Sequence, residues 1–425
     1  MKTLRICKVD DFKELELCLP SSKSLTQRAL ICASLAEGES FIKNPLISED
    51  TLLLKQALEL TGVEIEENDL EWRVKGINYP TLSGRRAYLG NNGTGSRFFL
   101  AYSCLGKGDW IEIYGKPRLH ERPVAPLVKA LKDLGAEIEC IEKEGFFPVV
   151  VREGNISGKE LSIPGNISSQ FISALLLIGA KLSSGLLLKI EGEMISGSYI
   201  EMTIKVMKEF GVSVEKDEEK REFRVFPGSY IPREYEVEAD ASSASYFLAI
   251  PLILGKGRVI VKNYSVNSAQ GDVKFLEYIK AMGANVKELS PLGVEVSFEG
   301  RPRGVEVDLS DTPDLFPTMC VLCAVAKGKS ILKGAPHLRY KETDRISAMV
   351  TELKKLGVNA EELPDGAIIY GTDIFKPALI NTYDDHRIAM SFAILGLKTG
   401  EIEIENPDCV KKSFPEFWEY LASIF

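Results

Sequence analysis

An internal repeat, marked by glycines that end apolar helical runs, constrains this chain more than any other feature. Six such glycines follow one another at intervals of 70, 77, 72, 71 and 72 residues, namely Gly38, Gly108, Gly185, Gly257, Gly328 and Gly400. Glycine suits the end of a helix because it adopts the left-handed conformation without a Cβ penalty. Repetition at a fixed period indicates that one supersecondary unit is used several times. A solenoid is the simplest alternative, but its repeats are about 20–50 residues long and chemically alike.

Each repeat continues with a β-rich segment and then a second helix. Five of these second helices end in a similar pattern, as in Leu60-Thr61-Gly62 and Leu134-Gly135-Ala136. The sixth, at residues 414–424, reaches the end of the chain before a strand can follow. We therefore expect the N-terminal segments 4–9 and 15–19 to complete the sixth repeat. The pattern predicts an α/β protein built from six βαβαββ-like repeats, three in each domain.

This layout predicts two domains, as does the length of 425 residues, which exceeds what one hydrophobic core usually serves. The first domain, residues 18–236, would be inserted into the second. The second domain would combine residues 1–17 and 237–425 and so contain both chain ends. Two crossings, near residues 18 and 237, would connect the domains and act as a hinge.

Composition excludes several classes of protein. A hydrophobic content of 45% and a charged content of 27% are globular values, and a net charge of −9 disfavours a nucleic-acid partner. The N-terminus has no apolar signal region, and the apolar runs are too short to cross a membrane. Cys320 and Cys323 form a lone CxxC inside an apolar run, which is typical of buried side chains rather than of a zinc site. We expect a cytoplasmic protein in which this CxxC does not bind zinc.

Loops that open the apolar helices carry the candidate binding residues of the first half. Helix N-termini present unpaired N–H groups and suit phosphate and carboxylate groups. The loop 20–28 contributes Lys23, Ser24 and Arg28, while the glycine-rich loop 90–97 would let backbone approach a ligand closely. Each loop alone is equally consistent with an ordinary capped helix. Their recurrence favours one anion-lined cleft.

The second half repeats this placement of cations at helix starts. Lys341 and Arg345 are four residues apart, and like charges at this spacing destabilise a helix. An anion between them would remove that penalty, although Glu342 partly offsets it. Segments 382–387 and 411–415 add His386, Arg387 and Lys412 to the set. Any one segment alone is more typical of a solvated surface patch.

Nine motifs together resemble the EPSP (5-enolpyruvylshikimate-3-phosphate) synthase family, an enolpyruvyl transferase family. They run in order from about residue 20 to residue 415: Ser22-Lys23-Ser24 with Arg28, residues 89–94 with Arg97, Glu121-Arg122-Pro123, Ser168-Ser169-Gln170, residues 240–246, Pro313-Asp314, residues 341–345, Asp385-His386-Arg387, and residues 412–415. The resemblance implies a two-domain inverse α/β barrel with the active site in the cleft between the domains. It also implies a cytoplasmic monomer without metal or redox cofactor, acting in aromatic amino-acid and chorismate biosynthesis and inhibited by glyphosate.

The resemblance further implies which residues bind the two substrates. Shikimate 3-phosphate would be bound by Lys23, Ser24, Arg28, Ser168, Ser169, Ser196, Tyr199, Asp314, His337 and Lys341. Phosphoenolpyruvate would be bound by Lys23, Gly93, Arg122, Gln170, Arg345, Arg387 and Lys412. His337 stands where many members have Asn, and Phe98 stands where Pro is common.

The resemblance also implies an addition followed by an elimination, with no covalent enzyme intermediate. We hypothesise that Asp314 takes the proton of the 5-hydroxyl, while Glu342, with Lys23, moves the proton at the methylene carbon. Two alternatives remain. A UDP-N-acetylglucosamine enolpyruvyl transferase would carry a reactive Cys in a mobile loop, but residues 115–123 contain none. A non-catalytic phosphate-binding scaffold would be expected to lose Asp314 and Glu342 first.

Overall fold

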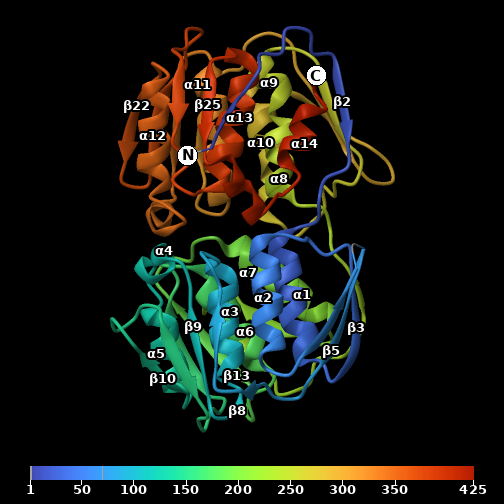
Figure 1. Cartoon of the computed structure of the whole chain (residues 1–425), viewed down its shortest axis with the longest axis vertical. Helices are drawn as coiled ribbons and strands as arrows, with labels where there is room; N and C mark the ends of the chain where they lie inside the picture. The colour runs from blue at the N-terminus through green and yellow to red at the C-terminus, as the bar shows by residue number, and fades with distance from the viewer. Residues whose placement is uncertain (1, 69) are drawn as a thin grey trace. The chain divides into compact units, whose positions relative to one another are not determined.

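The computed structural model describes residues 2–68 and 70–425, and these form two compact units (Figure 1). Unit 1 runs up to Pro20 and resumes at Glu238, so it contains both chain ends. Unit 2 is the continuous segment Ser21–Val237. Each unit has its own hydrophobic core.

Unit 2 contains three four-stranded sheets of one topology. Their strands are β3 (Gly38–Lys43), β4 (Glu64–Glu67), β5 (Glu71–Gly76), β7 (Arg85–Tyr88), β9 (Trp110–Tyr114), β10 (Glu137–Cys140), β11 (Val149–Arg152), β12 (Glu160–Pro164), β13 (Leu186–Glu191), β14 (Val214–Asp217), β15 (Glu222–Val225) and β16 (Glu234–Glu236). The strand orders are β16-β3-β5-β4, β7-β9-β11-β10 and β12-β13-β15-β14. In each sheet the first pair is parallel and the other pairs are antiparallel. A short parallel pair, β6 (Thr81–Leu82) and β8 (Lys107–Gly108), lies apart from them.

Unit 1 repeats this topology. Its strands are β1 (Thr3–Arg5), β2 (Glu14–Leu17), β17 (Arg258–Val261), β18 (Asn285–Glu288), β19 (Val294–Ser297), β20 (Glu306–Asp308), β21 (Lys329–Lys333), β22 (Asn359–Leu363), β23 (Gly366–Tyr370), β24 (Ala378–Ile380) and β25 (Ile402–Glu405). The strand orders are β2-β17-β19-β18, β20-β21-β23-β22 and β24-β25-β1. The third of these sheets has three strands.

The two N-terminal strands join different repeats, which partly corrects the expectation from sequence. β1 pairs antiparallel with β25 and so completes the sixth repeat, with Leu4 opposite Ile404. β2 instead pairs parallel with β17, with Leu15 opposite Val259, so the expectation that segment 15–19 completes the sixth repeat is wrong. The reason is topological. β16, the last strand of unit 2, pairs with β3 of the first repeat, and β2 takes the parallel edge of the fourth.

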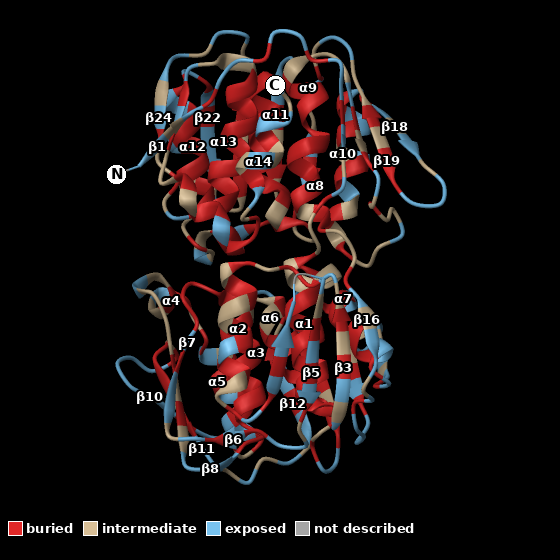
Figure 2. Ribbon diagram, turned by 45° about the vertical axis from the view of Figure 1, so that its right-hand side comes forward, coloured by how far each residue is buried: buried red, intermediate tan, exposed pale blue. Residues whose placement is uncertain are grey.

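Helices form the interior of each unit, and sheets cover them (Figure 2). The helices of unit 2 are α1 (Lys23–Leu35), α2 (Glu49–Glu59), α3 (Gly93–Ser103), α4 (Pro117–Glu121), α5 (Ala125–Asp133), α6 (Ser169–Gly179) and α7 (Gly197–Glu209). Those of unit 1 are α8 (Ala241–Leu248), α9 (Ile250–Leu254), α10 (Phe275–Met282), α11 (Phe316–Val325), α12 (Arg345–Lys355), α13 (His386–Thr399) and α14 (Phe417–Ala422), with short 3₁₀ helices η1 (Gly271–Lys274), η2 (Pro313–Leu315), η3 (Pro336–Tyr340) and η4 (Pro407–Lys412). Every residue of α11 is buried, as expected of a helix that is apolar on all sides.

The repeat glycines serve the turns that follow these central helices. All six have positive φ, between 68° and 129°. Gly400 is itself the C-cap of α13, whereas Gly38 already belongs to β3. The period therefore marks the turn from a helix to the next strand, and only in the sixth repeat the helix end itself.

A different glycine allows the N-terminal segment to pack on α13. Gly396 lies within this helix, and a Cβ placed on it would approach Ile6 Cβ and Cγ2, each at 2.7 Å. The Ile6 amide donates to the Ile402 carbonyl at 2.9 Å, which holds the segment against β25. Close approach of the chain that bears β1 therefore depends on the missing side chain of Gly396.

We predict that Gly396→Ala destabilises the protein by about 1–3 kcal/mol because the new methyl overpacks the contact with Ile6. We expect the cost of overpacking to exceed the roughly 1 kcal/mol by which Ala, relative to Gly, stabilises a helix interior. Urea denaturation followed by circular dichroism measures the change. In an Ile6→Ala background the same substitution should cost less, because two of the three nearest atoms are gone. A more stable Gly396→Ala protein would contradict the packing argument.

Candidate active site

Many of the polar side chains predicted to bind ligands lie at or near helix starts, where capping residues fix the backbone. Ser22, Asn92 and Ser168 cap α1, α3 and α6 in unit 2 by accepting bonds from backbone N–H groups. Asp344 and Asp385 do the same for α12 and α13 in unit 1. These caps satisfy donors that would otherwise lack partners. They also set where the following Lys and Arg side chains begin.

Arg28 is held rigidly inside unit 2. Its side chain is 1% exposed. Its Nε donates to Thr203 Oγ1 at 2.8 Å, and Nη1 and Nη2 donate to the Ser24 and Tyr199 carbonyls at 2.8 and 3.0 Å. Burial lowers the Arg28 pKa to about 10, which keeps the guanidinium charged at neutral pH. Phe98 is buried, and Arg28 Cζ lies 5.2 Å from its ring centroid.

A second arginine site forms around the glycine-rich loop. A Cβ on Gly93 would lie 2.2 Å from Arg122 Nη2, so this guanidinium packs directly on the glycine. Arg122 Nη1 donates to the Asn91 carbonyl at 3.2 Å. Arg97 Nη1 donates to the Gly93 carbonyl at 2.9 Å and to Gln170 Oε1 at 3.0 Å. Gly93, Arg122 and Gln170, predicted to bind one substrate, therefore lie together.

The remaining predicted residues of unit 2 lie at three helix starts. Lys23 opens α1, and its Nζ forms a salt bridge of 3.0 Å with Asp50. Ser168 Oγ accepts from the Gln170 amide at 3.3 Å, and Ser169 is buried beside it as the first residue of α6. Ser196 precedes α7 with a left-handed backbone, φ 54°. Tyr199 follows in that helix.

Unit 1 is organised around the buried guanidinium of Arg345, which is 1% exposed. Its Nε donates to Asp385 Oδ2 at 2.7 Å, Nη1 to Asp314 Oδ1 at 2.9 Å, and Nη2 to Glu342 Oε2 at 2.8 Å. Nη2 also reaches Asp385 Oδ1 at 3.4 Å. Burial alone would lower the Arg345 pKa, but Asp385, Glu342 and Asp314 outweigh it and raise the pKa. These bonds occupy four of its five N–H donors.

Asp314 is the anion that lies between Lys341 and Arg345. Its Oδ1 is 3.8 Å from Lys341 Nζ and 2.9 Å from Arg345 Nη1, and its Oδ2 is 2.7 Å from Arg387 Nη2. The spacing of the two cations predicted an anion there, and the protein's own carboxylate provides one. Burial alone would raise the Asp314 pKa. Arg387, Lys341 and Arg345 reverse this and hold the pKa well below its usual range.

His337 and Lys412 complete the predicted set of unit 1. His337 lies buried in η3, where burial and the charge of Lys341 lower its pKa to about 3. The imidazole is therefore neutral at pH 7 and can still donate or accept a hydrogen bond, as an Asn at this position would. Lys412 is buried at the end of η4, which packs against the helix that carries Arg387.

Several polar partners of the site were not predicted from sequence. Thr203, Asp50, Asn91, Tyr246 and Asp385 each contact a predicted residue through a hydrogen bond or ion pair. Asn91, Tyr246 and Asp385 lie within the motifs named above, whereas Asp50 and Thr203 lie in none of them. An acidic residue directly before a His-Arg pair at a helix start was a usable signal, because helix caps are commonly Asp. Thr203 gave no signal, since one Thr in a helix is unremarkable in sequence.

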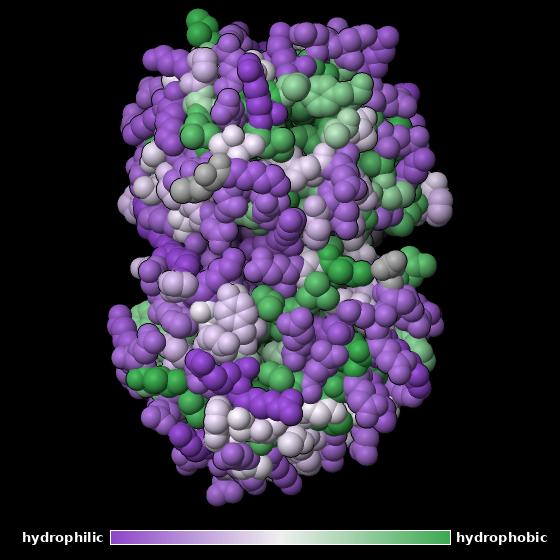
Figure 3. Space-filling view, viewed as in Figure 1, coloured by the Kyte–Doolittle hydropathy of each residue, from purple (hydrophilic) through white to green (hydrophobic). Residues whose placement is uncertain are grey.

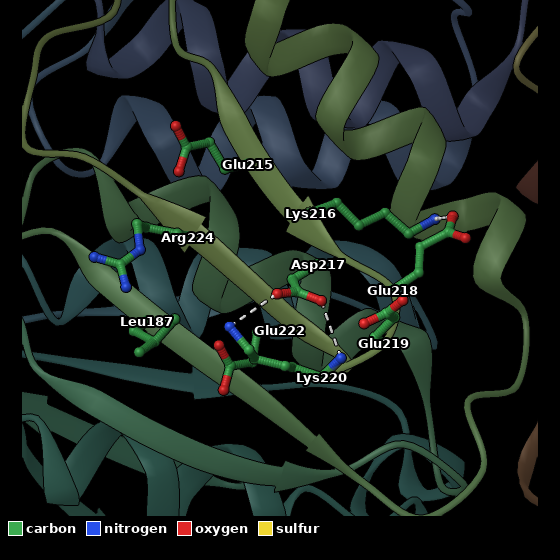
Figure 4. A pocket seen from close by; sticks show the side chains of 9 residues that line it. All are labelled: Leu187, Glu215, Lys216, Asp217, Glu218, Glu219, Lys220, Glu222 and Arg224. Atoms are coloured by element: carbon green, nitrogen blue, oxygen red, sulfur yellow. Dashed lines mark hydrogen bonds and ion pairs between the residues drawn. The ribbon is translucent and has the colours of Figure 1, made fainter.

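One surface hollow of unit 2 lies away from these residues. It measures about 750 Å³ and lies on β13, β14 and β15 of unit 2, lined by Leu187, Glu215, Lys216, Asp217, Glu218, Glu219, Lys220, Glu222 and Arg224 (Figure 4). Asp217 and Lys220 pair with one another at 3.2 Å, and Lys216 pairs with Glu218 at 3.1 Å. No predicted site residue lines it. On the face shown in Figure 3, most of the surface is hydrophilic.

Two other kinds of feature are absent from residues 2–68 and 70–425. No helix there has the length and apolar character needed to span a membrane. No group of three or more His, Cys, Asp or Glu side chains in the same residues is arranged to bind a metal ion. Cys320 and Cys323 are buried in α11.

An inverse α/β fold with Arg and Lys beside buried carboxylates at its helix starts defines a protein that handles small anionic molecules. A family model described as EPSP synthase (3-phosphoshikimate 1-carboxyvinyltransferase) matches residues 13–421, and the chain belongs to this family. Its activity is therefore enolpyruvyl transfer from phosphoenolpyruvate to shikimate 3-phosphate, a step of the shikimate pathway.

Individual relatives agree with this assignment. The 3-phosphoshikimate 1-carboxyvinyltransferase of Syntrophobacter fumaroxidans is 40% identical over 411 residues, which is 95% of each chain. That of Sulfurovum sp. is 41% identical over 416 residues, 96% of each chain. Among solved structures, EPSP synthase from Acinetobacter baumannii aligns with a TM-score of 0.82 and 26% identity, covering 100% of this chain and 98% of the other.

We predict that Thr203→Val destabilises the protein by about 1.5–3 kcal/mol, the usual loss for a hydrogen bond to a charged group. Val matches the shape of Thr but removes the acceptor of Arg28 Nε, and Thr203 is fully buried. Thr203→Ser retains the hydroxyl and serves as the matched control in chemical denaturation. A Thr203→Val protein as stable as the wild type would show that the hydroxyl contributes little to stability at this position.

Proposed function

We propose that Asp314 accepts the proton of the 5-hydroxyl of shikimate 3-phosphate. The observation that supports this role is the pairing of one buried carboxylate with Arg345, Arg387 and Lys341. These cations keep Asp314 ionised at neutral pH, as a proton acceptor must be. The same three cations also make Asp314 a weak base, so it must take the proton as the hydroxyl oxygen attacks phosphoenolpyruvate.

Charge neutralisation is the first task of such a site, because both substrates are polyanions. We propose that Lys23, Ser24, Arg28, Ser168, Ser169, Ser196, Tyr199, His337 and Lys341 bind shikimate 3-phosphate. Lys23, Gly93, Arg122, Gln170, Arg345, Arg387 and Lys412 bind phosphoenolpyruvate. Four of the five N–H donors of Arg345 already face carboxylates. Arg345 therefore offers a substrate one donor, and Arg387, Arg122 and Lys412 provide the larger share of the contacts.

The reaction then needs two proton movements at the methylene carbon. The 5-hydroxyl oxygen attacks C2 of phosphoenolpyruvate while Asp314 takes the hydroxyl proton, and Glu342, with Lys23, delivers a proton to C3. The elimination step then reverses the proton transfer at C3. A proton leaves C3 for Glu342 as phosphate leaves C2 beside Lys23 and Lys412. Glu342 is 8% exposed and accepts from Arg345 Nη2 at 2.8 Å, so its carboxylate is fixed in direction.

Two further inferences concern where and in what oligomeric state the protein acts, and which acceptor it does not use. We infer that the protein acts in the cytoplasm as a monomer, away from membranes and nucleic acid, in keeping with its net charge of −9. A UDP-sugar acceptor is disfavoured because the nearest cysteine before Arg122, Cys104, is 2% exposed, and burial raises its pKa. A buried thiol of this kind is a poor nucleophile or acid.

We predict that the purified protein releases phosphate only when shikimate 3-phosphate and phosphoenolpyruvate are both present.

Asp314→Asn should lower turnover by about 10²–10⁴-fold, the usual cost of losing a general base, while the affinity for shikimate 3-phosphate changes far less. A coupled phosphate assay and calorimetry measure the two quantities. Asp311→Asn, in the loop before η2, is the matched control. Near-normal turnover of Asp314→Asn would exclude the proposed base, and equal activity with UDP-N-acetylglucosamine would exclude the acceptor.

Gly93→Ala tests the phosphoenolpyruvate pocket. The added Cβ would overlap the Arg122 guanidinium, with Nη2 at 2.2 Å and Cζ at 2.5 Å, so Arg122 must move. We expect a higher KM for phosphoenolpyruvate and weaker competitive inhibition by glyphosate, each by about tenfold or more if one charge-assisted bond is lost. Gly228→Ala, whose Cβ would meet nothing within 4 Å, controls for adding a methyl group. Unchanged inhibition in Gly93→Ala would place the pocket elsewhere.

A further inference from the structure

Unit 1 contains a second buried carboxyl that the mechanism does not use. Asp272 lies in η1 and is 3% exposed. Ser242 Oγ, in the first turn of α8, donates to Asp272 Oδ2. The other oxygen, Oδ1, is buried and has no hydrogen-bond partner among residues 2–68 and 70–425. A buried carboxylate oxygen without a donor is costly, whereas a carboxylic acid carries its own proton there.

The surrounding contacts fix Asp272 relative to Asp314. Gln270 accepts from the Ala241 amide at 3.0 Å and donates to the Ala239 carbonyl at 2.8 Å, which ties η1 to the start of α8. On the other side, Tyr278 of α10 is hydrogen-bonded to Thr312 at 3.0 Å, directly before η2. α8 packs against both η1 and η2. Asp272 therefore lies in a rigid frame that it shares with the catalytic carboxylate.

The charged and titratable groups around Asp272 come from every element packed on it: Asp240 at the start of α8, Tyr264 after β17, Tyr278 of α10, Asp314 of η2 and Arg387 of α13. Burial raises the Asp272 pKa to about 7, and the negative charge of Asp314 adds to this. The Ser242 hydroxyl and Arg387 act in the opposite direction. At neutral pH the carboxyl is thus divided between its two forms.

We propose that Asp272 is a positioning residue that takes up a proton from solvent when an anionic substrate binds beside Arg387. The inference rests on the proposed function, which places phosphoenolpyruvate at Arg387. The positive charge of Arg387 favours the ionised form of Asp272. A bound anion that pairs with Arg387 weakens this effect, so the protonated form of Asp272 becomes more populated. The proton bonds to Oδ1, the oxygen without a partner. Its uptake removes one negative charge from the vicinity of Asp314 as the substrate adds its own.

Proton uptake on binding tests this directly. Shikimate 3-phosphate with glyphosate, saturating and unreactive, is titrated into the full-length protein at pH 7 in two buffers of different ionisation enthalpy. The wild type should take up about half a proton more than Asp272→Asn, because a group with a pKa near the working pH is half protonated. Protonation of the ligands themselves is common to both proteins and cancels. Equal uptake by the two proteins overturns the proposal.

Ser242→Ala provides a second variant that does not touch the carboxyl. The lost hydroxyl had favoured the ionised form, so Asp272 becomes more protonated before binding. Ligand-linked uptake at pH 7 should then fall, and its maximum should move to higher pH. A maximum that stays at the wild-type pH overturns the proposal, and this holds even where Asp272→Asn does not fold.

Steady-state kinetics supply a readout that a purely structural role would not move. Because the protonated form favours the anion, the wild-type KM for phosphoenolpyruvate should rise more between pH 6 and pH 8 than that of Asp272→Asn. The difference should be several-fold, with kcat changed little. Parallel KM profiles overturn the inference while leaving the proposed function intact. A failure of the proposed function appears separately, as a wild type without turnover on both substrates or as normal turnover of Asp314→Asn.

Discussion

The Arg345 guanidinium and the three carboxylates around it are the interaction on which the candidate site of unit 1 depends. One buried cation joins Asp314 in η2, Glu342 before α12 and Asp385 at the start of α13. Taking an ion out of water costs several kcal/mol unless its partners are well placed. With four directed bonds, the guanidinium stabilises three separate segments in one arrangement. Any change in one of the carboxylates therefore affects the other two.

The repeats explain how such segments come together. Each repeat places a central helix inside its unit and a sheet outside, and these helices pack on one another. α13 contacts α8 and α11 in unit 1, and α3 contacts α1 and α6 in unit 2. Caps such as Asp385 and Asn92 then fix the first turns. A helix start offers free N–H groups and a positive field. The scaffold thus supplies the same electrostatic feature six times, and different loop residues adapt it.

Sequence predicted the fold through its period, because turns that need positive φ recur wherever a central helix gives way to a strand. The prediction for segment 15–19 was wrong, because strand pairing between distant segments leaves no local pattern in the sequence. The residues of β2 alone do not show that this strand pairs with β17. The spacing of Lys341 and Arg345 suggested a bound anion between them, and it could not show that the carboxylate of Asp314, from another segment, lies there. Thr203 and Asp272 were invisible for the same reason. Their importance lies in burial and in the direction of a hydrogen bond.

The pairing of β1 with β25 sets an order for folding during synthesis. Thr3 lies opposite Glu405, so the sixth sheet cannot form until almost the whole chain has left the ribosome. Unit 2 is continuous and includes β16, the strand that completes its first sheet. It can therefore finish folding while the rest of unit 1 is still being made, as N-terminal domains commonly do. Meanwhile β1 and β2 remain unpaired, and the charged residues in and beside β1, namely Lys2, Arg5 and Lys8, limit its aggregation.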